Sequence, residues 1–155
     1  MTTHRISTDF YEHSYTLIAV HCSLADYQLA YLLNSQTFTK FKRIQDIDFY
    51  NNSISFSAYE WEDQKKDILW NLISNISGIV ASETNNNTLF DKETPVIINY
   101  LIPEQKKTDY FIKIDGELMQ KDTTGILNKI NKIPQIITAY IIEPNQLKSR
   151  NNLIL

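Results

Sequence analysis

Hydrophobic and polar positions alternate along most of this chain in patterns that predict strands, and two segments have the spacing of a helix instead. Residues 15–22 are apolar on both faces over Leu17 to Val20, which predicts a strand in the interior of a sheet. A helix is expected to begin at Ser23, because a carboxylate three residues later completes a capping-box pattern. The apolar stripe of this helix consists of Ala25, Leu29, Leu32 and Leu33.

The middle of the chain predicts further strands. Residues 38–48 alternate unevenly and are expected to form one bulged strand. Residues 53–58 and 68–76 alternate more regularly, and they are expected to pair as a hairpin around a charged tip at residues 60–66. Residues 83–95 are rich in asparagine, which favours turns, so a mobile loop is expected there.

The C-terminal third of the chain reads strand, turn, strand, helix, strand. Strands are expected over residues 96–102, 109–114 and 136–142, with a helix capped by Asp122 or Thr123 between the last two. The final strand is apolar on both faces, so it is expected to be the innermost strand of the sheet. Because a helical crossover joins parallel strands, residues 109–114 and 136–142 are expected to be parallel neighbours.

Together these elements predict the α+β class. The expected architecture is a single, mostly antiparallel sheet of about seven strands with two helices on one face and a C-terminal β-α-β unit. Two helices do not cover both faces of such a sheet, so Phe111, Tyr140 and Tyr59 are expected on the uncovered face. An apolar patch there marks either a self-association surface or a face covered by the tails of the chain.

Length and composition predict a single domain in the cytoplasm. The chain has 155 residues and a net charge of −3, and residues 1–13 are expected to form a loose N-terminal segment. Its one cysteine, Cys22, cannot form an internal disulfide, which favours a reducing, cytoplasmic location. No apolar run approaches the roughly 20 residues of a membrane helix, and no secretory signal pattern is present, so a soluble protein without membrane contact is expected.

Candidate catalytic chemistry is sparse. The carboxylates Glu104 and Asp109 lie near strand ends, where they would act as acid and base only if the fold brought them together. The histidines lack metal-motif spacing and the glycines are too scattered for a phosphate loop, so neither a metal nor a cofactor is expected. The negative net charge gives no reason to expect nucleic acid. Lys40, Lys42 and Arg43 are therefore interpreted as protection of an edge strand.

A tryptophan flanked by acidic residues is the most distinctive feature of the predicted hairpin tip. Trp61 lies between Glu60 and Glu62, and an exposed tryptophan is a common anchor for a protein partner. The alternative is that Trp61 folds back onto Trp70 or Tyr59 as a cross-strand pair.

The run Ile102-Pro103-Glu104 followed by Asp109-Tyr110 resembles a family of uncharacterised bacterial proteins named for an I-P-E…D-Y motif. Four residues separate the glutamate from the aspartate here, one more than the family motif has. The likeness covers nearly the whole chain and includes Asp26-Tyr27, Tyr59-Glu60-Trp61-Glu62, Ile133-Pro134-Gln135-Ile136 and Leu147-Lys148-Ser149. This resemblance implies a single cytosolic domain and no particular activity.

A second, local resemblance concerns residues 122–127, Asp-Thr-Thr-Gly-Ile-Leu, which are similar to the start of a helix in ACT-type regulatory domains. In those domains the backbone N–H groups of the helix N-terminus help to form an amino-acid site. The resemblance implies a ligand site at Asp122, Thr123 and Gly125. The preceding loop is longer than in that family, and Thr124 replaces its usual proline.

Three functional hypotheses follow from the sequence. The preferred one is a non-catalytic binding or adaptor domain whose partner is another protein or a second copy of the chain. The residues expected to contact this partner are Trp61, Phe111, Tyr140, Glu104 and Asp109. The alternatives are an ACT-like sensor of a small molecule such as an amino acid, and an enzyme that uses strand-end carboxylates, for which no catalytic residue is assigned.

Overall fold

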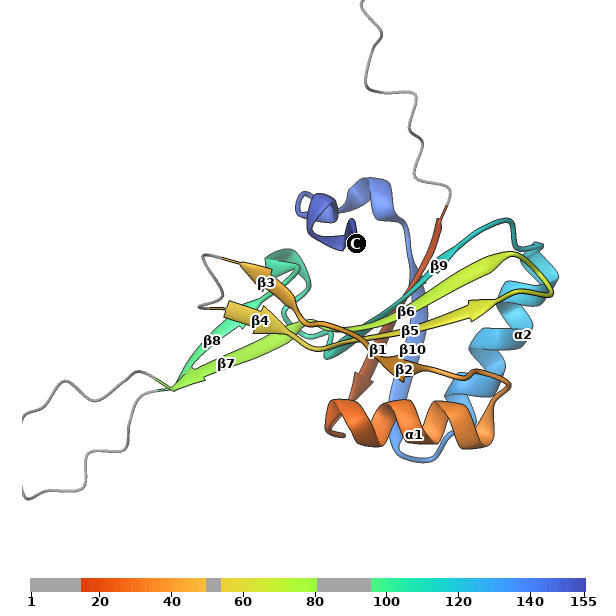
Figure 1. Cartoon of the computed structure of the whole chain (residues 1–155), viewed down its shortest axis with the longest axis horizontal. Coiled ribbons are helices and arrows are strands. Elements are labelled where there is room, and N and C mark those ends of the chain that lie inside the picture. The colour runs from red at the N-terminus through yellow and green to blue at the C-terminus, as the bar shows by residue number, and fades with distance from the viewer. Residues whose placement is uncertain (1–14, 50–53, 81–95) are drawn as a thin grey trace, which may run out of the picture.

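The computed structural model describes residues 15–49, 54–80 and 96–155 of the chain (Figure 1). Its largest element is a six-stranded sheet in the order β10-β1-β9-β6-β5-β2, in which every pair of neighbours is antiparallel. The strands of this sheet are β1 (Tyr15–Cys22), β2 (Lys42–Arg43), β5 (Ala58–Asp63), β6 (Ile68–Ser74), β9 (Tyr110–Asp115) and β10 (Ile136–Ile142). The α+β class and the mainly antiparallel sheet are therefore as predicted.

Smaller elements surround this sheet. Two antiparallel ribbons are formed by β3 (Ile47–Phe49) with β4 (Ile54–Phe56), and by β7 (Ile76–Val80) with β8 (Val96–Tyr100). The helices are α1 (Asp26–Gln36), α2 (Gln120–Asn131) and the 3₁₀ helices η2 (Pro103–Gln105), η3 (Pro144–Gln146) and η4 (Arg150–Leu153). The described residues contain no helix long and apolar enough to cross a membrane. The segments 1–13 and 83–95, predicted as a loose segment and a mobile loop, lie outside the described residues.

Strand β1 runs through the sheet between β10 and β9, as its apolar pattern predicts. Its four central residues, Leu17 to Val20, are fully buried. Ile18 and Val20 belong to the apolar cluster that contains the helices, whereas Leu17 and Ala19 belong to the cluster on the opposite face. Burial of both faces explains why this strand has no polar alternation.

Both helices pack on one face of the sheet, as predicted. Leu29 and Leu33 of α1, and Ile126 and Ile130 of α2, are buried in the same apolar cluster as Trp70 of β6. Figure 1 shows α1 below the strands and α2 to their right. Helix α1 begins later than the predicted cap at Ser23, at Asp26, and the Ala25 N–H donates instead to the side-chain oxygen of Gln28 at 3.0 Å.

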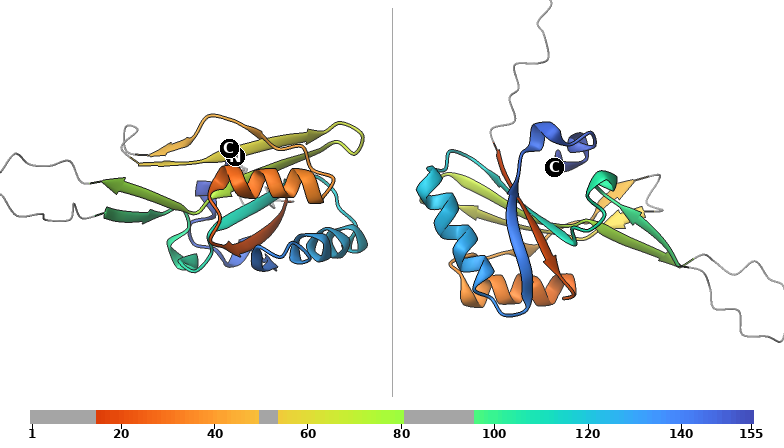
Figure 2. Two further views of the ribbon diagram at one scale, coloured as in Figure 1. Left: turned by 90° about the horizontal axis from the view of Figure 1, so that it is seen from below. Right: turned by 180° about the vertical axis from the view of Figure 1, so that it is seen from behind.

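The opposite face of the sheet is covered at one end, contrary to the expectation of an uncovered face. Phe111 is fully buried there and packs in a second apolar cluster with residues from the C-terminal segment and from the loop that follows β8. Those covering residues include Leu101, Ile102, Leu147 and Leu153. Figure 2 shows the C-terminal segment on the side away from α1. A tail of the chain therefore covers Phe111, while Tyr140 stays exposed. Tyr59 lies on the other face, in the cluster that contains the helices.

The β9-α2-β10 unit differs from the prediction in one respect. Strands β9 and β10 are parallel to each other, because both are antiparallel to β1, but β1 lies between them and they are not neighbours. Strand β10 is consequently an edge strand, not the innermost strand. Its apolar pattern on both faces was misleading because Ile137, Tyr140 and Ile141 are 77%, 40% and 48% exposed.

The main sheet has six strands instead of about seven, because predicted strands were divided differently by the fold. Residues 38–48, expected as one bulged strand, contain β2 and the start of β3, which belong to separate sheets. Residues 68–76 likewise contain β6 and the start of β7. A strand that leaves one sheet for another shows no break in its apolar alternation, so the sequence does not reveal the division.

Candidate functional site

The three residues of the predicted ACT-like ligand site lie close together, within one turn of helix α2. Helix α2 begins at Gln120, so Asp122, Thr123 and Gly125 all lie inside it. The N–H groups of Asp122 and Thr123 both donate to the Met119 carbonyl, and the Thr123 side chain is buried against the core. Asp122 and Gly125 are exposed. Because the helix starts earlier than the motif predicts, these N–H groups are used within its first turn.

Trp61 forms a cross-strand pair, which was the alternative to a partner anchor. It lies directly opposite Trp70 across β5 and β6, with ring centroids 5.5 Å apart. Phe38, which follows α1, packs against both tryptophans at 5.8 and 5.7 Å. Trp61 is half-buried by these contacts, which cover part of the aromatic surface that a partner would need.

Glu104 and Asp109 each hold a distant segment of backbone, and they do so separately. The Glu104 carboxylate accepts hydrogen bonds from the Ser149 N–H at 2.6 Å and the Ser149 hydroxyl at 3.0 Å, which attaches the C-terminal segment to η2. The Asp109 carboxylate accepts one from the Cys22 N–H at 3.0 Å, which attaches the end of β1 to the start of β9. Their contacts join pieces of the fold.

The remaining residues of the I-P-E…D-Y pattern also join segments that are far apart in sequence. Ile102 is fully buried, and its N–H donates to the Asn75 side chain at 2.8 Å. The Tyr110 hydroxyl donates to the Leu24 carbonyl at 2.6 Å. Burial, followed by negative charge on neighbouring groups such as Asp26, raises the pKa of Tyr110 well above its usual value, so the phenol stays a donor. The pattern therefore has a structural reason: it fixes the loop between β8 and β9.

Glu104 makes attachment of the C-terminal segment depend on pH. Partial burial acts to raise the pKa of Glu104, but the hydrogen bonds from Ser149 outweigh it and lower the pKa below its usual value. A lowered pKa in the folded state means that this stabilisation is complete above the pKa of about 4.3 in the unfolded chain, and is lost as pH falls through the folded pKa. We therefore expect the Ser149 amide resonance to titrate with a midpoint below that of an ordinary glutamate. NMR of the Glu104→Gln variant should show no such titration, and a wild-type midpoint at or above the ordinary value would contradict the assignment.

Three exposed apolar residues, Ile137, Tyr140 and Ile141, lie together on strand β10, at one edge of the sheet. This strand is seven residues long and contains no charged side chain. Ile141 pairs with Ile18 on the helix-covered face, and Tyr140 pairs with Ala19 on the other, so apolar side chains project from both faces of the edge. The opposite edge of the sheet, β2, consists only of Lys42 and Arg43, both exposed, as the interpretation of a charged edge strand predicted.

Two side chains from other elements support β10 in place. The amide of Asn131, the last residue of α2, donates to the Ala139 carbonyl at 2.9 Å and accepts from the Ala139 N–H at 2.8 Å. The Asn131 side chain thereby provides hydrogen-bond partners for the backbone N–H and carbonyl of Ala139 at the sheet edge. On the other face His21 stacks on Tyr140 with centroids 5.4 Å apart, and its ring nitrogen lies 3.0 Å from the Tyr140 hydroxyl. These contacts hold the Tyr140 ring at the edge.

Of the predicted partner-binding residues, only Tyr140 lies on this edge. Ile137 and Ile141, its exposed neighbours, were missed because an apolar strand was taken to be an interior one. The absence of charge in a strand that follows a helical crossover is a signal that fits either position, so the sequence alone did not distinguish them. The described residues contain no group of three or more His, Cys, Asp or Glu side chains arranged to hold a metal ion.

A scan against family models, a search of curated proteins and a search of solved structures find no match to this chain. Its resemblance to the I-P-E…D-Y proteins therefore stays a prediction.

Proposed function

We propose that this chain is a non-catalytic binding domain that associates with a second copy of itself through the exposed edge of β10. The observation that carries the proposal is the exposure of Ile137, Tyr140 and Ile141 on an uncharged edge strand. Proteins ordinarily protect a sheet edge with charges or by making it short, and β2 at the other edge has both forms of protection. A long, uncharged edge with large apolar side chains is typical of an interaction surface.

A second copy is the partner that fits this edge best. A symmetric dimer brings the same strand together with itself, so each apolar side chain meets an apolar counterpart and no charge is left without a partner. The exposed residues project from both faces of the edge, as packing against an equivalent edge requires. The backbone N–H and carbonyl of Ala139 are already hydrogen-bonded to Asn131. At that position the dimer contact therefore relies on side-chain packing and not on backbone hydrogen bonds between the two copies.

Replacing Ile137 and Ile141 together by lysine should weaken this association, because charge would be brought into the centre of an apolar contact. We expect analytical ultracentrifugation to show a concentration-dependent dimer for the wild-type chain. The double variant should raise the dissociation constant at least tenfold, about 1.4 kcal/mol.

Ile154→Lys is the matched control, because Ile154 is a similarly exposed isoleucine on the C-terminal segment. This variant should dimerise as the wild-type chain does. A wild-type chain that stays monomeric at the highest concentrations, or a dimer unaffected by the β10 charges, would refute the proposal.

A further inference from the structure

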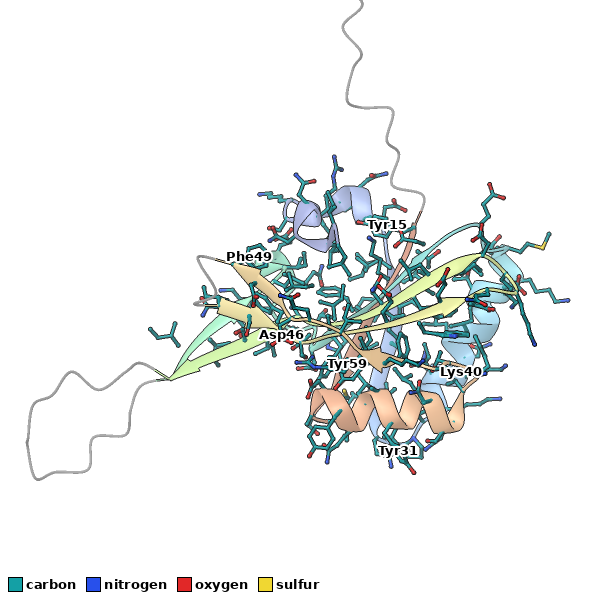
Figure 3. The ribbon with its side chains drawn as sticks, viewed as in Figure 1. Tyr15, Tyr31, Lys40, Asp46, Phe49 and Tyr59 are labelled. Carbon is teal, nitrogen blue, oxygen red and sulfur yellow. The ribbon has the colours of Figure 1, made fainter. Side chains whose placement is uncertain are left out.

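A polar cleft lies between the start of α1, strand β4, the start of β7 and the start of β9. It has a volume of about 330 Å³. Its lining residues are Ala25, Asp26, Asp46, Ser55, Ser57, Ser74, Ile76, Ser77 and Tyr110. Figure 3 shows Asp46 and Tyr59 in this region, between the β3–β4 ribbon and α1. None of the partner-binding residues of β10 belongs to this lining, so the cleft is independent of the proposed dimer contact.

The cleft is rich in serine hydroxyls, and one of them makes no hydrogen bond to another described residue. Ser74 uses its hydroxyl locally, donating to the Ile76 carbonyl at 2.9 Å. Ser77 is only 7% exposed, yet its hydroxyl makes no hydrogen bond within the described part of the chain. The Ser77 hydroxyl lines the cleft, so it can bind a polar group that enters there. Ser55 and Ser57 add further hydroxyls beside it.

Charges around the cleft disfavour an anion. Arg43 lies 3.6 Å from the Asp26 carboxylate and forms a second ion pair with Asp46. The Tyr59 hydroxyl also donates to Asp26 at 3.3 Å, which fixes that carboxylate at the mouth of the cleft. Two carboxylates against one guanidinium leave an excess of negative charge, so a phosphate or carboxylate ligand is repelled and an amino group is attracted.

We propose that this cleft binds a hydroxyl-rich ligand of monosaccharide size that is uncharged or carries an amino group. Its volume of about 330 Å³ corresponds to about eleven water molecules at ~30 Å³ each, which is close to the heavy-atom count of a monosaccharide. Serine hydroxyls both donate and accept, and carboxylates accept, which together complement the mixed donors and acceptors of a sugar. Ile76 and Tyr110 supply apolar and aromatic surface for its C–H groups.

The test is an NMR titration of the full chain with D-glucosamine, D-glucose and D-glucose 6-phosphate. We expect saturable shifts of the Ser57 and Ser77 amides with the first two sugars, tightest for glucosamine, and the weakest binding for the phosphorylated sugar. Ser77→Ala should raise the dissociation constant about fivefold, the effect of one hydrogen bond. Ser35→Ala is the control, because Ser35 is an exposed serine on α1 outside the cleft lining.

A second serine variant keeps the test valid if Ser77→Ala destabilises the protein. If Ser77→Ala lowers the melting temperature, Ser57→Ala, at a less buried position, provides the same comparison with a similar loss expected. The proposal is overturned if none of the uncharged and cationic sugars gives saturable shifts, if the sugar phosphate binds more tightly than glucosamine, or if removal of the hydroxyls leaves the dissociation constants unchanged.

Discussion

Replacing Asn75 by leucine should lower the free energy of unfolding by about 3 kcal/mol. Asn75 is fully buried between β6 and β7. Its amide donates to the carbonyls of Gln105 and Thr108, both at 2.9 Å, and accepts from the Ile102 N–H at 2.8 Å. Leucine has a similar volume but leaves the Thr108 carbonyl and the Ile102 N–H without these buried partners, at roughly 1–3 kcal/mol each. The Gln105 carbonyl keeps a hydrogen bond from the Thr108 N–H at 3.0 Å. Urea denaturation followed by circular dichroism measures the loss.

Asn71 provides the matched control on β6. It is 1% exposed, and its amide nitrogen and oxygen hydrogen-bond to no other group in the part of the chain that the structure describes. Removing a polar group that has no partner leaves no other group unsatisfied, so Asn71→Leu should be neutral or stabilising. Equal losses for the two variants would show that burial alone, and not the hydrogen bonds of Asn75, determines the effect.

Phe111→Ala should cost about 3–5 kcal/mol of stability, the range for deleting a fully buried phenylalanine. Its ring is 0% exposed and packs in the apolar cluster beneath the C-terminal segment, among Leu17, Ile73 and Leu147. Alanine leaves a cavity there, because the surrounding strands cannot collapse into the space. Thermal and urea unfolding should both show the loss.

Tyr140→Ala separates a core role from a binding role. Tyr140 is exposed at the sheet edge, so its truncation should change stability by less than about 1 kcal/mol and weaken the dimer. Phe111→Ala should not act in this way. If it weakened the dimer without lowering the stability measured by unfolding, the Phe111 ring would have to be accessible to a partner, which contradicts its buried position in the core.

The residues Glu104 and Asp109 of this chain hold together segments that are distant in sequence. From the sequence, Glu104 and Asp109 were candidates for a paired acid and base. In the structure each carboxylate binds a backbone N–H from a different remote segment, Ser149 in one case and Cys22 in the other. Asn75, which organises the same loop, lies in the segment 68–76 that was predicted only as a strand, since its contacts are made across about 30 positions of sequence.

Local pattern determined the elements whose residues interact mainly with their own segment or with one buried face. The strand at residues 15–22 and the buried stripe of α2 follow directly from apolar spacing, because each position's burial is set by the geometry of a single strand or helix. The α+β class follows from the order of such elements.

Only the tertiary structure decided which strands are neighbours, which faces are covered and where exposed apolar side chains remain. The insertion of β1 between β9 and β10 turned an expected interior strand into an edge, and the C-terminal segment turned an expected open face into core. Both outcomes depend on pairing between segments distant in sequence. A strand's own residues specify that apolar side chains must be buried, but they do not specify which segment, or which molecule, buries them.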